Sequence, residues 1–391
     1  MVFPDLTDIP EEVLEIARTL EAAGHEAWCV GGALRDHLLG DTGTDYDLAT
    51  SAHPEEVQRL FRRTAAVGVR HGTVGVIDRR RVMHEVTTFR RDVATDGRHA
   101  TVAYGVTLEE DLARRDFTIN ALAYHPLRRE WRDPFGGAAD LERRVIRAVG
   151  SPAERFREDY LRILRALRFA SRFGFAIEPD TWAAAREAAG GLRQLSAERV
   201  RDEWFKGLAT ALDPATLARL WREVGAARAW LPELPEPAAW PGAATLPRDP
   251  VLLTVLYVSD PVAVLRRLKA SNAEVGRAAA VVQGPAAPAG TTGADARRWL
   301  ASVGGAADDH LAMHRLRHAA EPDWAPAVRG VRERGEAVSR GQLAIGGVEL
   351  QQLGLSGPRV GEVLATLLDR VLEEPSLNTR ERLLELARAL P

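Results

Sequence analysis

The chain has 391 residues, of which 46% are hydrophobic and 27% are charged, and these values predict a globular protein of about two to four domains. The formal net charge of −3 excludes a strongly basic nucleic-acid-binding chain, so any basic surface must be local. The single cysteine excludes an internal disulfide framework, and the lack of a long apolar run or a signal-peptide pattern predicts a cytoplasmic protein without a membrane span.

The first 90 residues predict a small α/β domain with a mixed sheet. Residues 9–23 carry apolar side chains at helical spacing, with Pro10 near the start and Gly24 after the end. The apolar run 27–30 predicts a strand that buries Cys29. Similar patterns predict two more helices, over 33–39 and 53–61, and a hairpin of two strands, over 73–77 and 82–86. This order of elements is typical of an α/β domain.

Gly31 and Gly32 stand between the first predicted strand and the helix over 33–39. A helix entered through two glycines leaves bare backbone N–H groups at its N-terminus, where phosphate binds well. The alternative is a tight turn without a ligand. A dinucleotide-binding turn is excluded, because it needs a third glycine three residues after the second and position 35 is arginine.

Asp45 and Asp47 follow a turn-rich segment, 40–43. If residues 45–48 form a strand, the two carboxylates point the same way, one pleat apart. Two such carboxylates repel each other unless a cation lies between them, and their oxygen atoms are suitable ligands for Mg²⁺. An Asp-x-Asp motif can also lie on the solvated surface. Here it closely follows the predicted phosphate-binding helix N-terminus, which favours a site for nucleoside triphosphates and metal ions.

The pattern GG-x-x-RD, a short spacer and D-x-DLAT resembles the first signature of class II tRNA nucleotidyltransferases, the family of bacterial CCA-adding enzymes and poly(A) polymerases. The resemblance implies an N-terminal head with the DNA polymerase β-like nucleotidyltransferase fold. It also implies that Asp45 and Asp47 are catalytic and hold two Mg²⁺ ions, and that Gly31, Gly32 and Arg35 seat the triphosphate.

Glu85 lies on the second strand of the predicted hairpin, in the string E-V-T-T-F-R, which is similar to the family's pattern at this strand. A third catalytic carboxylate beside Asp45 and Asp47 would help to hold two metal ions. The alternative is a strand glutamate that faces solvent or pairs with an arginine. The sequence leaves both interpretations open.

Residues 91–107 form a polar stretch with little periodicity. In the family this region is a mobile loop over the active site that is implicated in adding A after CC, and residues 96–99 resemble its pattern. Ala100 replaces the proline that is common there, which leaves open whether the full CCA sequence is made. The structural alternative is a long surface hairpin.

Residues 114–121, RRDFTINA, match the family's second signature. The resemblance places Arg115, Asp116 and Asn120 beside the ribose and the triphosphate. Guanidinium groups suit phosphate because they are permanently charged and fork-shaped. Residues 133–141, DPFGGAADL, match the third signature and predict a hinge between the head and a helical neck.

Residues 143–172 are basic, with nine arginines against three acidic residues. Four arginines follow at steps of three, three and four on one side of a helix predicted over 154–171: Arg162, Arg165, Arg168 and Arg172. Such a stripe suits a phosphate backbone, and an ordinary solvated face is the alternative. We expect Arg165 and Arg168 to bind the nucleotide and Arg172 to bind RNA.

The string Glu158-Asp159-x-x-Arg162 matches the fourth signature, in which the Asp and the Arg hydrogen-bond the edge of the incoming base. Cytosine and adenine both present an amino donor beside a ring-nitrogen acceptor, whereas guanine and uracil present a carbonyl in place of that amino group. A carboxylate and a guanidinium therefore select C and A without a nucleic-acid template. The resemblance assigns this role to Asp159 and Arg162.

Residues 196–203 fit the fifth signature, with Ser196 as a helix N-cap, and predict a brace for the neck. Alanine- and leucine-rich helices are predicted beyond about residue 209. Near the C-terminus, Gly357 and Arg359 open a predicted helix whose N-terminus suits a backbone phosphate, and this pattern resembles the tRNA-binding tail of the family. A helix-capping glycine is the alternative.

These patterns predict an α+β protein, in which a mixed-sheet nucleotidyltransferase head is followed by all-α neck, body and tail domains, at residues 1–142, 143–208, 209–300 and 301–391. We expect a CCA-adding tRNA nucleotidyltransferase that uses tRNA, CTP, ATP and Mg²⁺. The alternatives are a poly(A) polymerase, a CC-only or A-only adding enzyme, or a non-catalytic RNA-binding protein, against which the intact Asp45 and Asp47 argue. The oligomeric state stays open.

Overall fold

The computed structural model describes residues 3–6, 8–41, 45–68, 72–95, 100–245 and 248–390. The chain divides into two compact units, Met1–Pro237 and Ala238–Pro391. The finer division into head, neck, body and tail stays a prediction. In the part of the chain so described, no helix combines the length and the apolar character that are needed to cross a membrane.

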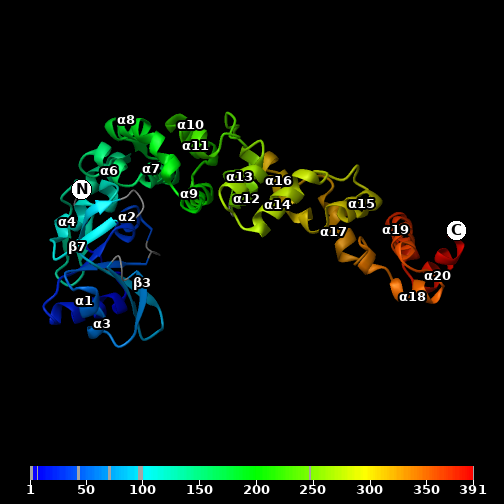
Figure 1. The fold of residues 1–391 in the computed structure, drawn as a ribbon, viewed down its shortest axis with the longest axis horizontal. Coiled ribbons are helices and arrows are strands. Elements are labelled where there is room, and N and C mark those ends of the chain that lie inside the picture. The colour runs from blue at the N-terminus through cyan, green and yellow to red at the C-terminus, as the bar shows by residue number, and fades with distance from the viewer. Residues whose placement is uncertain are drawn as a thin grey trace. The chain divides into compact units, whose positions relative to one another are not determined.

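The described residues of the head form a mixed sheet of seven strands, in the order β3-β4-β5-β2-β1-β8-β9 (Figure 1). β2 and β5 run parallel, and the other neighbouring pairs of this sheet are antiparallel. This arrangement confirms the predicted mixed sheet. The strands are β1 (Ala27–Val30), β2 (Asp47–Thr50), β3 (Thr64–Gly68), β4 (Thr73–Ile77), β5 (Met83–Thr88), β8 (Ala123–His125) and β9 (Glu130–Arg132).

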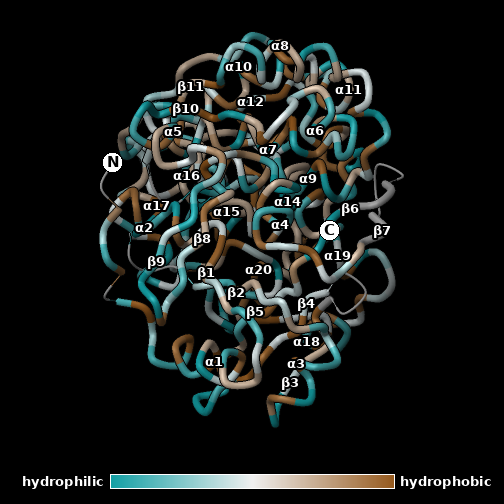
Figure 2. Tube along the Cα trace, turned by 90° about the vertical axis from the view of Figure 1, so that its left-hand side faces the viewer, coloured by the Kyte–Doolittle hydropathy of each residue, from teal (hydrophilic) through white to brown (hydrophobic). Residues whose placement is uncertain are grey.

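Helices and a second hairpin complete the head. α1 (Glu11–Ala22) buries Val13, Ile16 and Leu20 against the sheet beside α3 (Figure 1), and its hydrophobic and hydrophilic residues alternate along the tube in Figure 2. Cys29 is buried in the core, as predicted. The other elements are α2 (Gly32–Leu38), α3 (Pro54–Leu60), β6 (Arg90–Thr95), β7 (Ala100–Tyr104), α4 (Leu108–Ala113), η2 (Thr118–Asn120) and α5 (Gly137–Arg143).

The prediction of one helix over 154–171 is wrong, because the chain forms two helices there, α6 (Pro152–Glu158) and α7 (Leu161–Phe173). Asp159 lies between them with an extended backbone, at φ −154° and ψ 105°. Its carboxylate accepts a hydrogen bond from the backbone N–H of Leu161 at 3.0 Å. An Asp side chain that binds the backbone two residues further on favours a turn over a continuous helix.

The remaining elements of the first unit extend the neck. α9 begins directly after Ser196, as predicted, although the Ser196 side chain makes no capping hydrogen bond. These elements are β10 (Val145–Ile146), β11 (Ala176–Ile177), α8 (Pro179–Ala188), η3 (Ala189–Gln194), α9 (Ala197–Thr210), α10 (Pro214–Val224) and α11 (Ala226–Trp230). β10 and β11 pair in parallel as a separate two-stranded sheet.

The head and α7 share one hydrophobic core. Leu34 and Leu48 of the head belong to the same buried cluster as Ala166 and Phe169 of α7. A polar contact reinforces the junction, since Nε of Arg147 in the neck donates to a carboxylate oxygen of Asp140 in the head at 3.1 Å. The third signature therefore forms a packed joint within the first unit.

The described residues of the second unit are helical. Its elements are α12 (Pro250–Tyr257), α13 (Pro261–Arg267), α14 (Asn272–Gln283), α15 (Gly293–Val303), η4 (Gly304–Ala306), α16 (Ala307–His318), α17 (Ala325–Glu333), η5 (Arg340–Gln342), α18 (Gly347–Gln352), α19 (Pro358–Glu373), η6 (Pro375–Leu377) and α20 (Arg380–Ala389). Gly357 precedes α19 with a φ of 59°, so the prediction of a helix opened by Gly357 and Arg359 is confirmed.

Gly137→Ala should destabilise the first unit, because a Cβ at this position would lie 2.2 Å from the backbone oxygen of Thr118. Overpacking of this kind costs about 1–3 kcal/mol of unfolding free energy. The measurement is the urea midpoint of unfolding. The matched control is Gly190→Ala, since a Cβ there meets nothing within 4 Å. Equal midpoints for the two variants would contradict the proposed close approach.

Candidate functional site

A cavity of about 660 Å³ opens between the head sheet and α7, within the first unit. Among the described residues that line it are nine arginines and four acidic groups, so its walls favour a polyanion. Most of the residues predicted for the site meet here: Gly31, Gly32, Arg35, Asp47, Glu85, Arg115, Asp116, Asn120, Asp159, Arg162, Arg165, Arg168 and Arg172. The cavity thus brings together segments from both the head and the neck.

Two carboxylates meet at the floor of this cavity. β2 and β5 are parallel, with Leu48 opposite Val86, so Asp47 and Glu85 take corresponding places one residue earlier on each strand. Burial raises the pKa of Asp47, and the charges of Glu85 and Asp45 raise it further against the opposing effect of Arg115, to about 6. A bound cation would offset both the desolvation and the nearby negative charge of Glu85.

Asp45 lies just outside β2, which begins at Asp47. Asp45 and Asp47 each leave part of their surface open to solvent, although the protein around Asp47 excludes enough water to raise its pKa. Tyr46 between them is buried, so the predicted alternation of faces holds although the strand begins later than expected. No group of three or more His, Cys, Asp or Glu side chains in the described ranges is arranged to hold a metal ion. Two carboxylates nevertheless fit Mg²⁺, which commonly binds one or two carboxylates together with water and substrate phosphates.

Gly31 brings the backbone against Arg115. Its φ of 78° favours glycine, and a Cβ there would lie 2.8 Å from a terminal nitrogen of Arg115. One terminal nitrogen of Arg115 donates to the backbone oxygen of Asn120 at 3.3 Å, and the other lies 3.5 Å from Asp111. Its buried Nε has no hydrogen-bond partner within the described part of the chain. The backbone N–H of Gly31 donates to the backbone oxygen of Leu122 at 3.3 Å, so Gly31 gives the guanidinium room and the guanidinium itself suits a phosphate group.

Arg35 lines the cavity, but neighbours hold most of its guanidinium. The side chain is buried and donates to Asp36 at 2.8 Å and to the side-chain oxygen of Asn120 at 2.5 Å. It also lies over the rings of Phe169 and Phe173, at 5.0 and 4.9 Å from their centroids. This geometry favours a role in positioning the walls, and the predicted contact with triphosphate stays a prediction.

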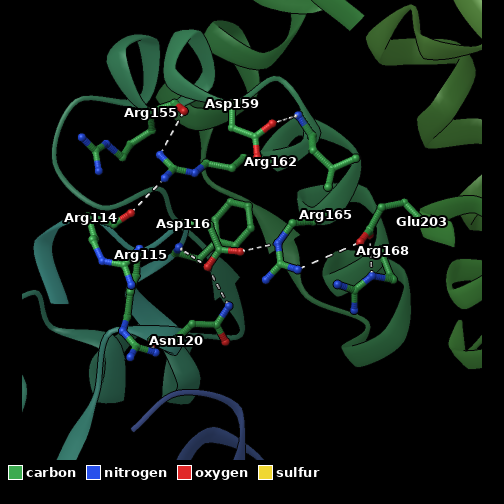
Figure 3. Close-up of polar contacts among 12 residues, drawn as sticks. Arg114, Arg115, Asp116, Asn120, Arg155, Asp159, Arg162, Arg165, Arg168 and Glu203 are labelled. Atoms are coloured by element: carbon green, nitrogen blue, oxygen red, sulfur yellow. Dashed lines mark hydrogen bonds and ion pairs between the residues drawn. The ribbon is translucent and has the colours of Figure 1, made fainter. Parts of the chain in front are cut away.

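Asp116 connects the head to the neck through a chain of ion pairs (Figure 3). It accepts hydrogen bonds from Asn120 at 2.9 Å and from Arg165 at 2.7 Å. Glu203 on α9 lies 2.6 Å from Arg168 and 4.0 Å from Arg165. Burial alone raises the pKa of Asp116, but Arg165 and the hydrogen bonds outweigh it and hold the pKa at about 2.

Asp159 and Arg162 also line the cavity, and both are already held in place (Figure 3). Asp159 accepts from Arg199 at 2.6 Å and from the backbone of Leu161. Arg162 donates to Glu158 at 2.6 Å and to the backbone oxygen of Arg114 at 2.9 Å. A carboxylate and a guanidinium have more hydrogen-bonding positions than these contacts use, so both retain capacity for a ligand.

Sequence reasoning missed several groups of the site. Arg90, Arg114 and Arg199 line the cavity without having been assigned to it, and Glu203 holds the arginines of α7. A signal was available, because each of these residues lies in a string that resembles a family pattern. Arg90 lies in the string that contains Glu85, Arg114 in the second signature, and Arg199 and Glu203 in the fifth. Spacing alone did not indicate that these side chains turn toward one cavity.

Three predicted features lie elsewhere. Residues 96–99 lie outside the described residues, although the flanking β6 and β7 form the hairpin that was the structural alternative. Gly357 and Arg359 belong to the second unit, where Arg359 donates to Glu362 at 3.0 Å. Their contact with RNA stays a prediction, as does that of Arg172, which lies 3.3 Å from Asp36 in the first unit.

Comparison with known families matches two stretches of the chain. The model of the poly A polymerase head domain matches residues 27–147, and that of the probable RNA and SrmB-binding site of polymerase A matches residues 174–236. The CCA-adding enzyme of Anoxybacillus flavithermus is 47% identical over 197 residues, which are 50% of this chain and 49% of that relative. The CCA-adding enzyme of Levilactobacillus brevis is 48% identical over 209 residues, or 51% of each chain.

A solved structure extends the similarity along the chain. The Bacillus stearothermophilus CCA-adding enzyme in complex with CTP superposes with a TM-score of 0.83 at 33% identity, covering 97% of this chain and 96% of that one. By sequence, in contrast, the matched region spans only about half the length of the curated relatives. The fold of the whole chain, and not only its head, therefore has a close counterpart.

Asp116→Asn should lower the unfolding free energy by about 2 kcal/mol at pH 7, since the pKa of about 2 lies well below the usual 3.8. A depressed pKa adds stability that is present above 3.8 and is lost as the pH falls through about 2. The deficit of the variant in urea unfolding should therefore stay constant from pH 8 to pH 5.

The matched control is Asp202→Asn, which removes an exposed carboxylate on α9 and should change the unfolding free energy by less than about 0.5 kcal/mol. A deficit of Asp116→Asn as small as that of the control would show that the ion-pair chain contributes no stability.

Proposed function

The chain belongs to the family of poly(A) polymerases and CCA-adding enzymes, and from this premise we propose that it is a nucleotidyltransferase that adds C, C and A to the 3′ end of tRNA. Its substrates would be tRNA, CTP and ATP, and it would act in the cytoplasm. One observation carries the proposal: the carboxylates of β2 and β5 and the Asp159–Arg162 pair open onto the same positively charged cavity.

The chemistry assigned to the site is attack of the tRNA 3′-hydroxyl on the α-phosphate of the nucleotide. Divalent metal ions are generally used in this family, and we propose that Asp45 and Asp47 hold Mg²⁺, which when bound would supply charge neutralisation at the phosphates and a more acidic attacking hydroxyl. The raised pKa of Asp47 supports this role in part, because after burial the nearby charge of Glu85 raises it most, and a cation would offset both effects. Glu85 shares that edge as a neighbouring carboxylate.

The chain's own groups would bind and orient the triphosphate. Gly32 and Arg115 would offer backbone and guanidinium donors on one wall of the cavity, and Gly31, whose N–H donates to Leu122, would leave room for the guanidinium. Arg35 would hold that wall through Asp36 and Asn120. Such preorganised donors stabilise charge on phosphate without reorganising during the reaction.

The base would be read by Asp159 and Arg162. The carboxylate would accept from the amino group of cytosine or adenine, and the guanidinium would donate to the adjacent ring nitrogen. Arg199 and Glu158 support this assignment by fixing the two side chains at 2.6 Å each. Arg165 and Arg168, held by Asp116 and Glu203, would add positive charge beside the nucleotide.

Purified protein incubated with tRNA that ends before CCA should add CCA when CTP and ATP are both present, and CC with CTP alone. Asp47→Ala should abolish addition while tRNA affinity stays unchanged, because the carboxylate is assigned to the metal ion and not to RNA. Gel analysis of extended tRNA and a binding titration provide the two measurements. Glu55→Ala, an exposed carboxylate on α3, is the control.

The products distinguish the alternatives. Long A tails would indicate a poly(A) polymerase, and addition that stops after CC or needs a CC end would indicate a partial CCA enzyme. Binding of tRNA without any extension would indicate an RNA-binding protein. Near-normal activity of Asp47→Ala would remove this residue from the metal site.

Asp159→Ala and Arg162→Ala should reduce base selection more than phosphoryl transfer. Loss of one good hydrogen bond to a base edge costs about 1–3 kcal/mol of discrimination, which corresponds to a fall of roughly ten- to a hundredfold in preference over UTP and GTP. The measurement compares the efficiency of all four nucleotides with tRNA lacking CCA.

Arg157→Ala provides the control for this comparison, since Arg157 is exposed on α6 and does not line the cavity. If Asp159→Ala and Arg162→Ala are slow yet reject UTP and GTP as strongly as the wild type does, the base is read by other residues.

A further inference from the structure

A second cavity, of about 400 Å³, lies within the second unit and takes no part in the proposed reaction. Aliphatic side chains of α12 and α14 form much of its wall, including Val255 and Val281. Its polar lining includes three histidines of α16, His310, His314 and His318. Arg317 and Ser259 also line it, so nonpolar side chains and several convergent polar groups share the wall, as they do in many ligand sites.

The three histidines follow one another at steps of four residues. Side chains at positions i and i+4 are neighbours on a helix, so the imidazoles form one stripe along α16. The rings of His314 and His318 lie close, with centroids 4.5 Å apart and an angle of 42° between their planes. Two imidazoles at this spacing can bind the same metal ion, as pairs of histidines one helical turn apart do in zinc enzymes.

His310 lies at the buried end of the stripe. Only 3% of its surface is exposed, and its Nε2 has no hydrogen-bond partner within the described ranges. Gly284 leaves room beside this nitrogen, because a Cβ there would lie 2.9 Å from it. The buried His125 of the first unit differs, since its Nε2 lies 2.9 Å from Glu21. Buried polar atoms are normally paired, so the bare nitrogen points to a ligand.

Ring packing explains only part of this arrangement. His310 meets Trp299 at 5.8 Å and His314 meets Trp324 at 6.2 Å, both nearly edge to face. These contacts account for where the rings lie, but they use no ring nitrogen.

We propose that His314 and His318 bind one divalent transition-metal ion at this cavity, and the bare Nε2 of His310 lies deeper in the same lining. No group of three or more metal-binding side chains is close enough together in the described part of the chain, so two imidazoles and water would complete the coordination. Imidazole ligands select Zn²⁺, Ni²⁺ or Cu²⁺ over Mg²⁺. The site therefore differs in chemistry from the carboxylates of the first unit.

Zn²⁺ titration by calorimetry tests the proposal, with the full chain in buffer containing excess Mg²⁺ to occupy carboxylate sites. The wild type should bind one Zn²⁺ per chain. His314→Gln and His318→Gln should each weaken binding by about tenfold or more, because a single imidazole loses the chelate. His310→Gln should have a smaller effect. His25→Gln, in the first unit, is the matched control and should bind like the wild type.

Cu²⁺ bound at less than one equivalent provides the second measurement, since its electron paramagnetic resonance spectrum reports nitrogen ligands directly. The wild type should show two imidazole nitrogens, and His314→Gln should lose that signal. Wild-type Zn²⁺ affinity in both pair variants, or a Cu²⁺ spectrum with oxygen ligands alone, would overturn the proposal. The assigned pair would likewise be overturned if His318→Gln left Zn²⁺ affinity unchanged while His310→Gln lowered it strongly.

Discussion

The site depends on the ion-pair chain that runs from Asp116 through Arg165 to Glu203 and Arg168. Each charge in it is buried or half-buried, so each is costly to take out of water unless its partner is present. Because Asp116 belongs to the head and the others to neck helices, the electrostatic requirement fixes the orientation of α7 toward the sheet. A single constraint therefore both holds the junction and positions arginines around the cavity.

The same constraint sets the charge of the cavity. Arginines gathered in one place repel one another, and carboxylates such as Asp36, Asp116 and Glu203 offset this repulsion without cancelling the net positive lining. At the floor the balance reverses, since Asp47 and Glu85 crowd negative charge and raise the pKa of Asp47. A cavity with a positive wall and a negative floor suits a triphosphate together with a cation.

Much of the site was predictable from sequence. The two glycines, Asp47, Arg115 and the Asp159–Arg162 pair all line one cavity, although spacing only suggested them in separate strings. The prediction of one continuous helix over 154–171 was wrong. The apolar residues keep their helical spacing on both sides of the turn at Asp159, which the Asp159 side chain stabilises through a local hydrogen bond, so spacing alone does not reveal the turn. Arg35 illustrates another limit of prediction from sequence. A buried arginine that holds neighbouring side chains, as Arg35 holds Asp36 and Asn120, has the same sequence pattern as an arginine that binds phosphate. β3, β8 and β9 were missed because their short runs lack a clear alternation.

Local chemistry and spacing by themselves determined the early helices and strands of the head, the glycine turn, the paired carboxylates and the basic character of the neck, because each depends on residues near one another along the chain. Only the tertiary structure decided which groups meet. The parallel pairing of β2 with β5 brings Asp47 beside Glu85, and α7 and α9 bring Arg165 to Asp116 and Glu203. Such contacts join residues about 40 to 50 positions apart, and burial and charge compensation select them, which no local pattern encodes.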